Sequence, residues 1–210
     1  MLLGVVATAT TTSYNVILDA ARPGRGDKPA KTTTIAYRDV LSQLWLLDPV
    51  GGWSPVRNAL TRLGSAPKHH LADPALAARL LGADVDSLLD DSVAGPPVPR
   101  HGALLGALFE SLVTSSVQVY AQAAEAAVHH LRTRDGDHEV ALIVERADHR
   151  VVALETKLSP TVGDRDVAHL RWLRDRIGDD LLDAAVVTTG AEAYRRSDGI
   201  AVLPAALLGP

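Results

Sequence analysis

Cysteine is absent from the 210 residues of the chain, and this absence limits the chemistry that the protein can carry. Without cysteine there is no disulfide, no thiolate nucleophile and no zinc site built from sulfur ligands. A metal ion would have to be held by carboxylate or histidine side chains, a ligand set that favours Mg²⁺-like chemistry. We expect no cofactor unless the protein is an active metal-dependent enzyme, in which case we expect Mg²⁺.

Long hydrophobic runs are also missing. The longest apolar stretches, such as 184–187 and 201–208, are far shorter than the roughly 20 residues that cross a bilayer. The apolar N-terminus has no Lys or Arg before it, so it fits a secretory signal poorly. We therefore predict a cytoplasmic protein that does not span a membrane.

Two catalytic motifs are lacking as well. No Gly-x-x-x-x-Gly-Lys-Ser/Thr loop occurs, so the chain has no phosphate-binding loop for ATP. No Gly-x-Ser-x-Gly motif occurs, which leaves no basis for a serine hydrolase.

The composition is that of a globular protein, with 47% hydrophobic residues and a net charge of −4. This charge argues against coating nucleic acid through bulk electrostatics, although a local basic face remains open.

The first half of the sequence predicts a small helical, winged-helix-like domain over residues 1–95. Helices are expected at 13–21 and from Thr32 to Trp45, and Asp73 is expected to cap a helix at 75–81. Short extended stretches are expected at 45–47 and 69–72. A stretch rich in Gly and Pro at 95–99 predicts a domain boundary.

The second half, residues 101–210, predicts an α/β domain with a mixed sheet flanked by helices. Apolar periodicity predicts helices, and short apolar or alternating runs predict strands. The expected order is helix 103–127, strands 128–132, 139–146 and 150–158, helix 164–177 and strand 182–188.

The stretch Val151-Val152-Ala153-Leu154-Glu155-Thr156-Lys157 could carry chemistry. Side chains alternate along a strand, so Glu155 and Lys157 point the same way. Phosphodiester hydrolysis uses a carboxylate that holds Mg²⁺ and a lysine that stabilises negative charge. The alternative is an ordinary surface pair at a strand end.

Several segments together resemble the DUF4143 family, which follows the motor module of many prokaryotic AAA-type ATPases. They are 102–113, 137–140, 154–157, 183–190 and 199–204, with weaker N-terminal segments at 32–37 and 68–73. The resemblance implies a PD-(D/E)XK nuclease-like, restriction-endonuclease-like fold for the second half. It also implies that Glu110, an acid on the second strand, Glu155 and Lys157 form the catalytic site, with Glu110 and Glu155 as metal ligands.

One position departs from the resemblance. Where the family usually has an aspartate on the second strand, this chain has Ala141, whose methyl group cannot ligate a cation. Glu139 would share the strand face of Ala141 but would lie about 6.6 Å along the strand, and Asp137 would lie farther still. We therefore expect a degenerate nuclease-like domain that binds DNA or a partner protein without catalysis.

Two other functions stay open. One is an active Mg²⁺-dependent nuclease in which Glu139 or Asp137 replaces the missing ligand. The other is a protein-interaction module for a separate AAA-type ATPase or for self-association, with no contact to nucleic acid.

Further side chains have residue types suited to binding. Arg165, His169 and Arg171 could face phosphates, although a solvated helix face is the favoured explanation. The paired histidines, 69–70 and 129–130, cannot chelate one ion as strand neighbours, and the first pair is expected at a polar strand edge. The three tryptophans, Trp45, Trp53 and Trp172, are expected to be core or interface anchors.

Overall fold

The structure is a computed structural model, and it describes residues 31–55, 66–89, 101–133 and 136–209. The predicted helix at 13–21 lies outside the described residues. The chain divides into two compact units, 1–49 with 66–112 and 50–65 with 113–210. The division falls inside strand β1 (Leu47–Gly52) and helix α7 (His101–Ala123).

The first unit is mainly helical. It contains α3 (Lys31–Gln43), β2 (Lys68–Leu71), α5 (Pro74–Leu80), α6 (Val85–Leu89) and the first half of α7. Asp73 caps α5 as predicted, because its Oδ1 accepts a hydrogen bond of 2.8 Å from the Ala75 N–H. The buried core of this unit consists of Leu47, Leu71, Ala77, Leu104 and Leu108.

Helix α3 ends in an unusual way. The Leu46 N–H donates to the Leu41 carbonyl at 3.0 Å, which closes the helix with a residue in the left-handed conformation. That residue is Trp45, at φ 57°, where glycine is the usual occupant. Its side chain is 86% exposed, so of the two roles expected for Trp45, core or interface anchor, the core position is excluded.

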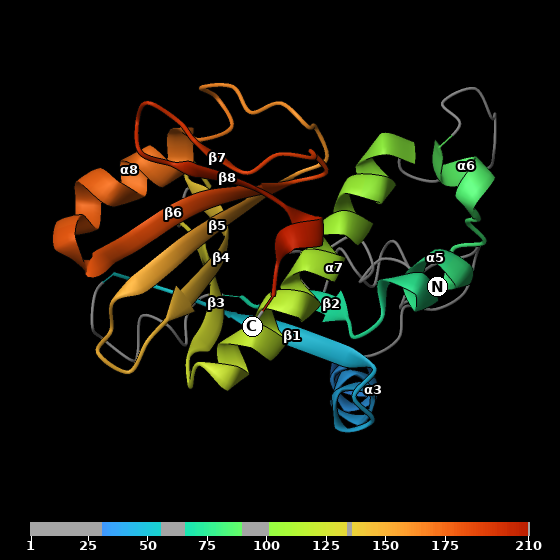
Figure 1. The fold of residues 1–210 in the computed structure, drawn as a ribbon. Helices are drawn as coiled ribbons and strands as arrows, with labels where there is room; N and C mark the ends of the chain where they lie inside the picture. The colour runs from blue at the N-terminus through green and yellow to red at the C-terminus, as the bar shows by residue number, and fades with distance from the viewer. Residues whose placement is uncertain (1–30, 56–65, 90–100, 134–135, 210) are drawn as a thin grey trace. The chain divides into compact units, whose positions relative to one another are not determined.

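The sheet is mixed, and those of its strands that lie wholly or partly in the second unit follow the order β1-β3-β4-β5-β6-β8-β7 (Figure 1). Strands β3, β4 and β5 are antiparallel neighbours, whereas β5, β6 and β8 run parallel to one another. The bounds are β3 Ala127–Arg132, β4 Glu139–Glu145, β5 Val151–Lys157, β6 Leu181–Thr188, β7 Tyr194–Arg195 and β8 Ala201–Pro204.

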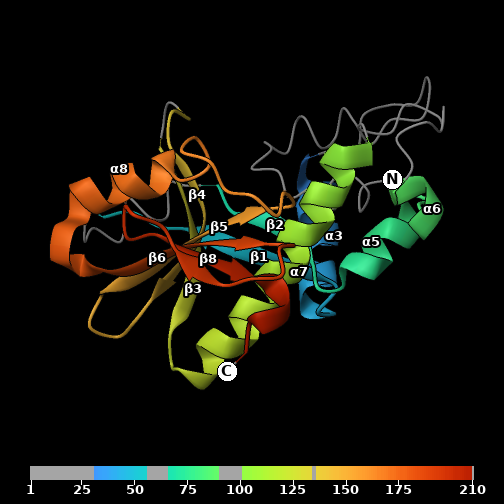
Figure 2. The same ribbon diagram turned by 45° about the horizontal axis from the view of Figure 1, so that its top comes forward.

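Helix α8 (Ala168–Ile177) packs against β4, β5 and β6, and Figure 2 shows it running along one side of these strands. Leu170 and Leu173 of this helix are fully buried in the core. Trp53 is also a core residue, as predicted, with 5% of its surface exposed. Two short 3-10 turns, 178–180 and 205–207, complete the described elements.

The sequence placed the start of α8 four residues too early. Residues 164–167 form a turn in which the Gly163 N–H donates to Asp166 at 2.9 Å. The Asp166 N–H donates to the Gly163 carbonyl at 3.2 Å, a three-residue spacing tighter than that of an α-helix. Strand β8 and helix α6 were not predicted as elements.

The predicted fold class is confirmed, since the structure is a mixed α/β arrangement with helices beside a mixed sheet. Within the part of the chain that the structure describes, residues 103–123 of α7 are long and apolar enough to cross a bilayer. This is weak evidence for a membrane span, because core helices of soluble proteins share the same length and composition.

Candidate functional site

The carboxyl end of β5 presents the pair expected from the sequence. Strand alternation puts Glu155 and Lys157 on the face of Val151 and Ala153, which pack into the core beside α8. Glu155 is buried, with 8% of its surface exposed, and Lys157 is half-buried. The strand therefore positions both residues on one face, with the carboxylate largely withdrawn from solvent.

Strand β4 is irregular where the missing aspartate would lie. Its register against β3 shifts, because Ile143 pairs with His129 while Val140 pairs with Leu131. One extra residue therefore sits in β4, as in a β-bulge. Val140 and Ile143, three residues apart, both pack into the core beside α8. Regular alternation between Glu139 and Ala141 thus does not hold through this strand, which removes the basis for placing Glu139 on the face of Glu155.

Glu110 lies on α7 in the first unit, where it is engaged by a lysine. Lys68 Nζ lies 3.0 Å from Glu110 Oε1, and the lysine side chain is only 5% exposed. The ion pair compensates the charge of an ammonium group that is almost completely removed from water.

Strand β2, which carries Lys68, differs from its predicted character. Its four side chains are all buried, so the expectation of a polar surface at His69 and His70 was wrong. His70 Nδ1 lies 3.1 Å from the buried Ser111 Oγ. Burial lowers the pKa of His69, and the nearby Arg38 lowers it further, so the ring is neutral near pH 7.

A histidine pair lies where α8 meets the start of β4. His138 Nδ1 and His169 Nδ1 are 3.3 Å apart, and the His138 ring stacks on Trp172 with ring centroids 4.0 Å apart. Burial lowers the pKa of His169, the charges of His138 and Lys157 lower it further, and Glu139 opposes them. Lys157 and Glu139 are therefore close enough to this pair to act on it electrostatically.

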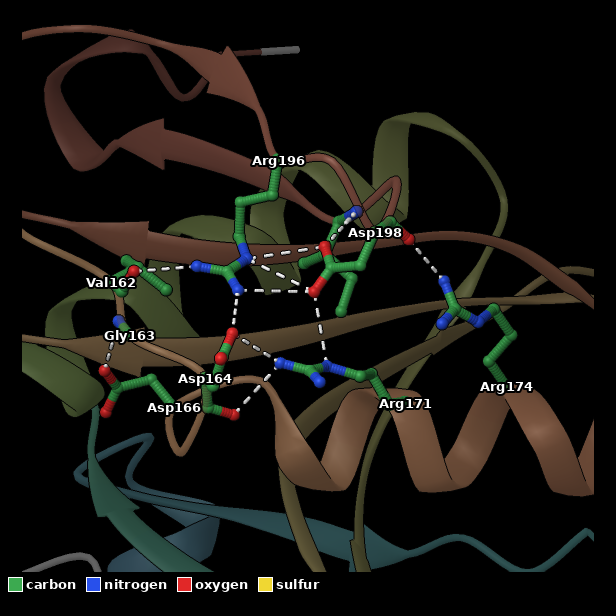
Figure 3. A network of polar contacts seen from close by, with 9 residues as sticks. Val162, Gly163, Asp164, Asp166, Arg171, Arg174, Arg196 and Asp198 are labelled. Carbon is green, nitrogen blue, oxygen red and sulfur yellow. Dashed lines mark hydrogen bonds and ion pairs between the residues drawn. The ribbon is translucent and has the colours of Figure 1, made fainter.

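The basic residues of α8 are partly engaged within the protein (Figure 3). Arg171 Nη2 lies 2.8 Å from Asp164 Oδ1. Arg171 Nε forms an ion pair with Asp198 Oδ2 at 3.2 Å, without the alignment of a hydrogen bond. Arg196, in the loop after β7, donates one hydrogen bond of 2.6 Å to the Asp164 carboxylate and another of 2.8 Å to the Val162 carbonyl. Arg165 is exposed.

A second set of titratable groups surrounds the buried Glu145. His149 Nδ1 lies 3.0 Å and His129 Nε2 3.5 Å from its carboxylate oxygens. A small pocket beside it is lined by Trp53, Ser54, Pro55, Glu145, His149, Ile177 and Asp180.

The sequence did not predict that His138 and Trp172 stack on each other, because they come from separate elements and share no local motif. Across the described residues, no group of three or more His, Asp or Glu side chains is arranged so that it could hold a metal ion. Lys157 therefore lies near the histidine pair, and the described residues gather no carboxylates around Glu155 into a metal site.

Comparison with known proteins gives one family. No curated protein and no solved structure matches the chain. A family model described as "Domain of unknown function (DUF4143)" matches residues 105–208. This region of the chain is therefore similar to the DUF4143 domain family.

Proposed function

We propose that this protein is a non-catalytic, nuclease-like binding module whose partner is another protein. The loss of catalysis is inferred from Ala141, which replaces the acid that the DUF4143 resemblance would require on the second strand. The irregular pairing of β4 supports the same inference, because it disturbs the alternation that a neighbouring acid would need to substitute.

One observation carries the choice of a protein partner. Trp45 is 86% exposed and left-handed at φ 57°. A bulky side chain in that conformation costs about 1–2 kcal/mol, and an exposed ring recovers little of it through packing. Such a residue is best explained by a contact that only a binding partner provides, since tryptophan is enriched among the residues that dominate protein interfaces.

The residues that precede Trp45 in the sequence also expose apolar side chains. Tyr37, Val40 and Leu44 are each at least half exposed and recur at spacings of three and four residues along α3. This spacing puts them on one side of the helix. We call Tyr37, Val40, Leu44 and Trp45 the α3 surface. An exposed apolar surface of this kind is typical of a helix that packs against another protein.

The partner that the resemblance implies is a separately encoded, cytoplasmic AAA-type ATPase. We infer from the same resemblance that the first unit, which carries the α3 surface, is winged-helix-like. DNA is the weaker alternative, because Arg171 and Arg196 are bound to Asp164 and Asp198. Phosphate contacts would have to displace these internal ion pairs.

The test measures binding of the purified chain to a AAA-type ATPase from the same genome and to labelled single- and double-stranded DNA. We expect ATPase binding that changes little between about 50 and about 200 mM salt and weakens at least tenfold in Trp45→Ala. Light scattering of the chain alone reports self-association. Tight DNA binding that falls steeply with salt, with no ATPase binding, would overturn the proposal in favour of DNA.

A further inference from the structure

The histidine pair at the start of β4 has a geometry suited to a metal ion. His138 immediately precedes β4, and His169 is the second residue of α8, 31 positions later in the sequence. Their rings are inclined at 82° with centroids 5.5 Å apart, and the two Nδ1 atoms face each other at 3.3 Å.

This distance allows two arrangements of the same atoms. In the first, one imidazole carries its proton on Nδ1 and donates it to the lone pair of the other. In the second, both rings carry the proton on Nε2, and both Nδ1 lone pairs are available to a cation. Passing from one to the other requires only that the donor ring change its tautomer, with no net loss of a proton.

The separation agrees with tetrahedral coordination. Two Zn–N bonds of about 2.0–2.1 Å at a tetrahedral angle place the nitrogens about 3.3–3.4 Å apart. The observed Nδ1 to Nδ1 distance is 3.3 Å, so the two rings already have the spacing of two ligands on one ion.

The surroundings of the pair both support and oppose a cation. The His138 ring is held by stacking on Trp172 with an interplanar angle of 10°, which lowers the cost of ordering it. Glu139 adjoins His138 and acts electrostatically on His169, so its negative charge favours a cation at the pair. Lys157 carries a positive charge nearby and opposes binding.

We propose that His138 and His169 form a binding site for a divalent transition metal such as Zn²⁺ or Ni²⁺. The two imidazoles supply two ligands and water completes the coordination, because no three His, Asp or Glu side chains among the described residues are placed to hold a metal ion together. Imidazole ligands select Zn²⁺, Ni²⁺ and Cu²⁺ over Mg²⁺, which prefers oxygen ligands. A bound ion would clamp the start of β4 to α8, independently of the α3 surface and of catalysis.

The test is calorimetric titration of the chelator-treated full chain with ZnCl₂, together with thermal unfolding with and without the metal. We expect one Zn²⁺ per chain, a higher Tm in its presence, and no competition by excess Mg²⁺. His138→Gln and His169→Gln should each weaken binding about tenfold or more, because each removes one of two nitrogen ligands. Lys157→Met should strengthen it.

The matched control is His149→Asn, which removes an exposed histidine paired with Glu145 and keeps a residue that tolerates φ 66°. This variant should bind Zn²⁺ as the unaltered chain does. Absence of Zn²⁺ binding, binding unchanged in both His138→Gln and His169→Gln, or binding lost only in His149→Asn would overturn the proposal.

A second measurement avoids dependence on variant folding. Cu²⁺ bound at the pair should quench the fluorescence of Trp172, which lies against the His138 ring. In the unaltered chain this quenching should saturate. Zn²⁺ added beforehand, in excess because Cu²⁺ binds imidazole more tightly than Zn²⁺, should raise the Cu²⁺ concentration needed, whereas excess Mg²⁺ should not. A Cu²⁺ titration that excess Zn²⁺ leaves unchanged would contradict a shared site.

Discussion

The ammonium group of Lys68 lies 3.0 Å from the carboxylate of Glu110, although 42 residues separate them in the sequence. The lysine side chain is 5% exposed and the glutamate side chain 21%. The residue expected to ligate a metal is therefore the counter-ion of a buried cation. Its first role in the structure is to make that burial possible.

We predict that Glu110→Ala lowers the free energy of unfolding by about 1–3 kcal/mol, because it leaves the Lys68 charge buried without this partner. Urea denaturation measures the change. The double variant Lys68→Met with Glu110→Leu should lower the free energy of unfolding by clearly less than the sum of the two single changes. A stable Glu110→Ala protein would contradict the importance of the pair.

The left-handed residue at the end of α3 gives a second prediction. Trp45→Gly should raise the free energy of unfolding by about 1 kcal/mol, because glycine adopts φ 57° without strain and little packing is lost. Trp45→Ala is the control, since it removes the ring but keeps the strained Cβ. Both variants should lose ATPase binding, and only the glycine variant should gain stability. Equal stability of the two would argue against strain at this position.

The network of Figure 3 predicts a dependence of stability on pH. Hydrogen bonds from Arg196 and then Arg171 lower the pKa of Asp164 below its usual range. Burial alone would raise the pKa of Asp198, but the Ile200 N–H and Arg196 outweigh it, and the net shift is downward.

Because the folded-state pKa values are depressed, the stabilisation is fully present above the ordinary aspartate value near pH 4. It is lost as the pH falls through the lower folded-state values. Arg196→Gln should therefore destabilise the chain at pH 7 and flatten the loss of stability between about pH 5 and pH 2. Denaturant midpoints across this range measure it. An unchanged acid profile would show that Arg196 does not set these pKa values.

The sequence predicted most helices and strands, because apolar periodicity is a local property. It missed where α3 and α7 end, for a shared reason. Trp45 at φ 57° and Glu125 at φ 51° hold the left-handed positions where glycine would have marked a stop. The early start assigned to α8 arose because Asp164 binds Arg171 and Arg196, a contact that only the folded chain creates.

The candidate site was only partly predictable. Alternation along β5 puts Glu155 and Lys157 on the face of the core residues Val151 and Ala153. The approach of His138 to His169 depends on packing between α8 and the start of β4, and the bulge in β4 depends on its pairing with β3. No local pattern reports either relationship.

Ala141 gives a further prediction, since it is 6% exposed in β4. Ala141→Asp should destabilise the chain by about 2–4 kcal/mol without metal, because it buries a carboxylate, while Ala141→Val should cost less. Thermal unfolding with and without Mg²⁺ measures both. Full recovery of Ala141→Asp by Mg²⁺ would instead reveal a site that retains its other ligands.

The most direct test of the account is cleavage of single- and double-stranded DNA with Mg²⁺ or Mn²⁺. The assay compares the chain with Ala141→Asp and with Ala141→Asp combined with Lys157→Ala. We predict that the unaltered chain does not cut DNA, and that any activity appears only in Ala141→Asp and disappears with Lys157→Ala. Cleavage of DNA by the unaltered chain would contradict a non-catalytic binding module.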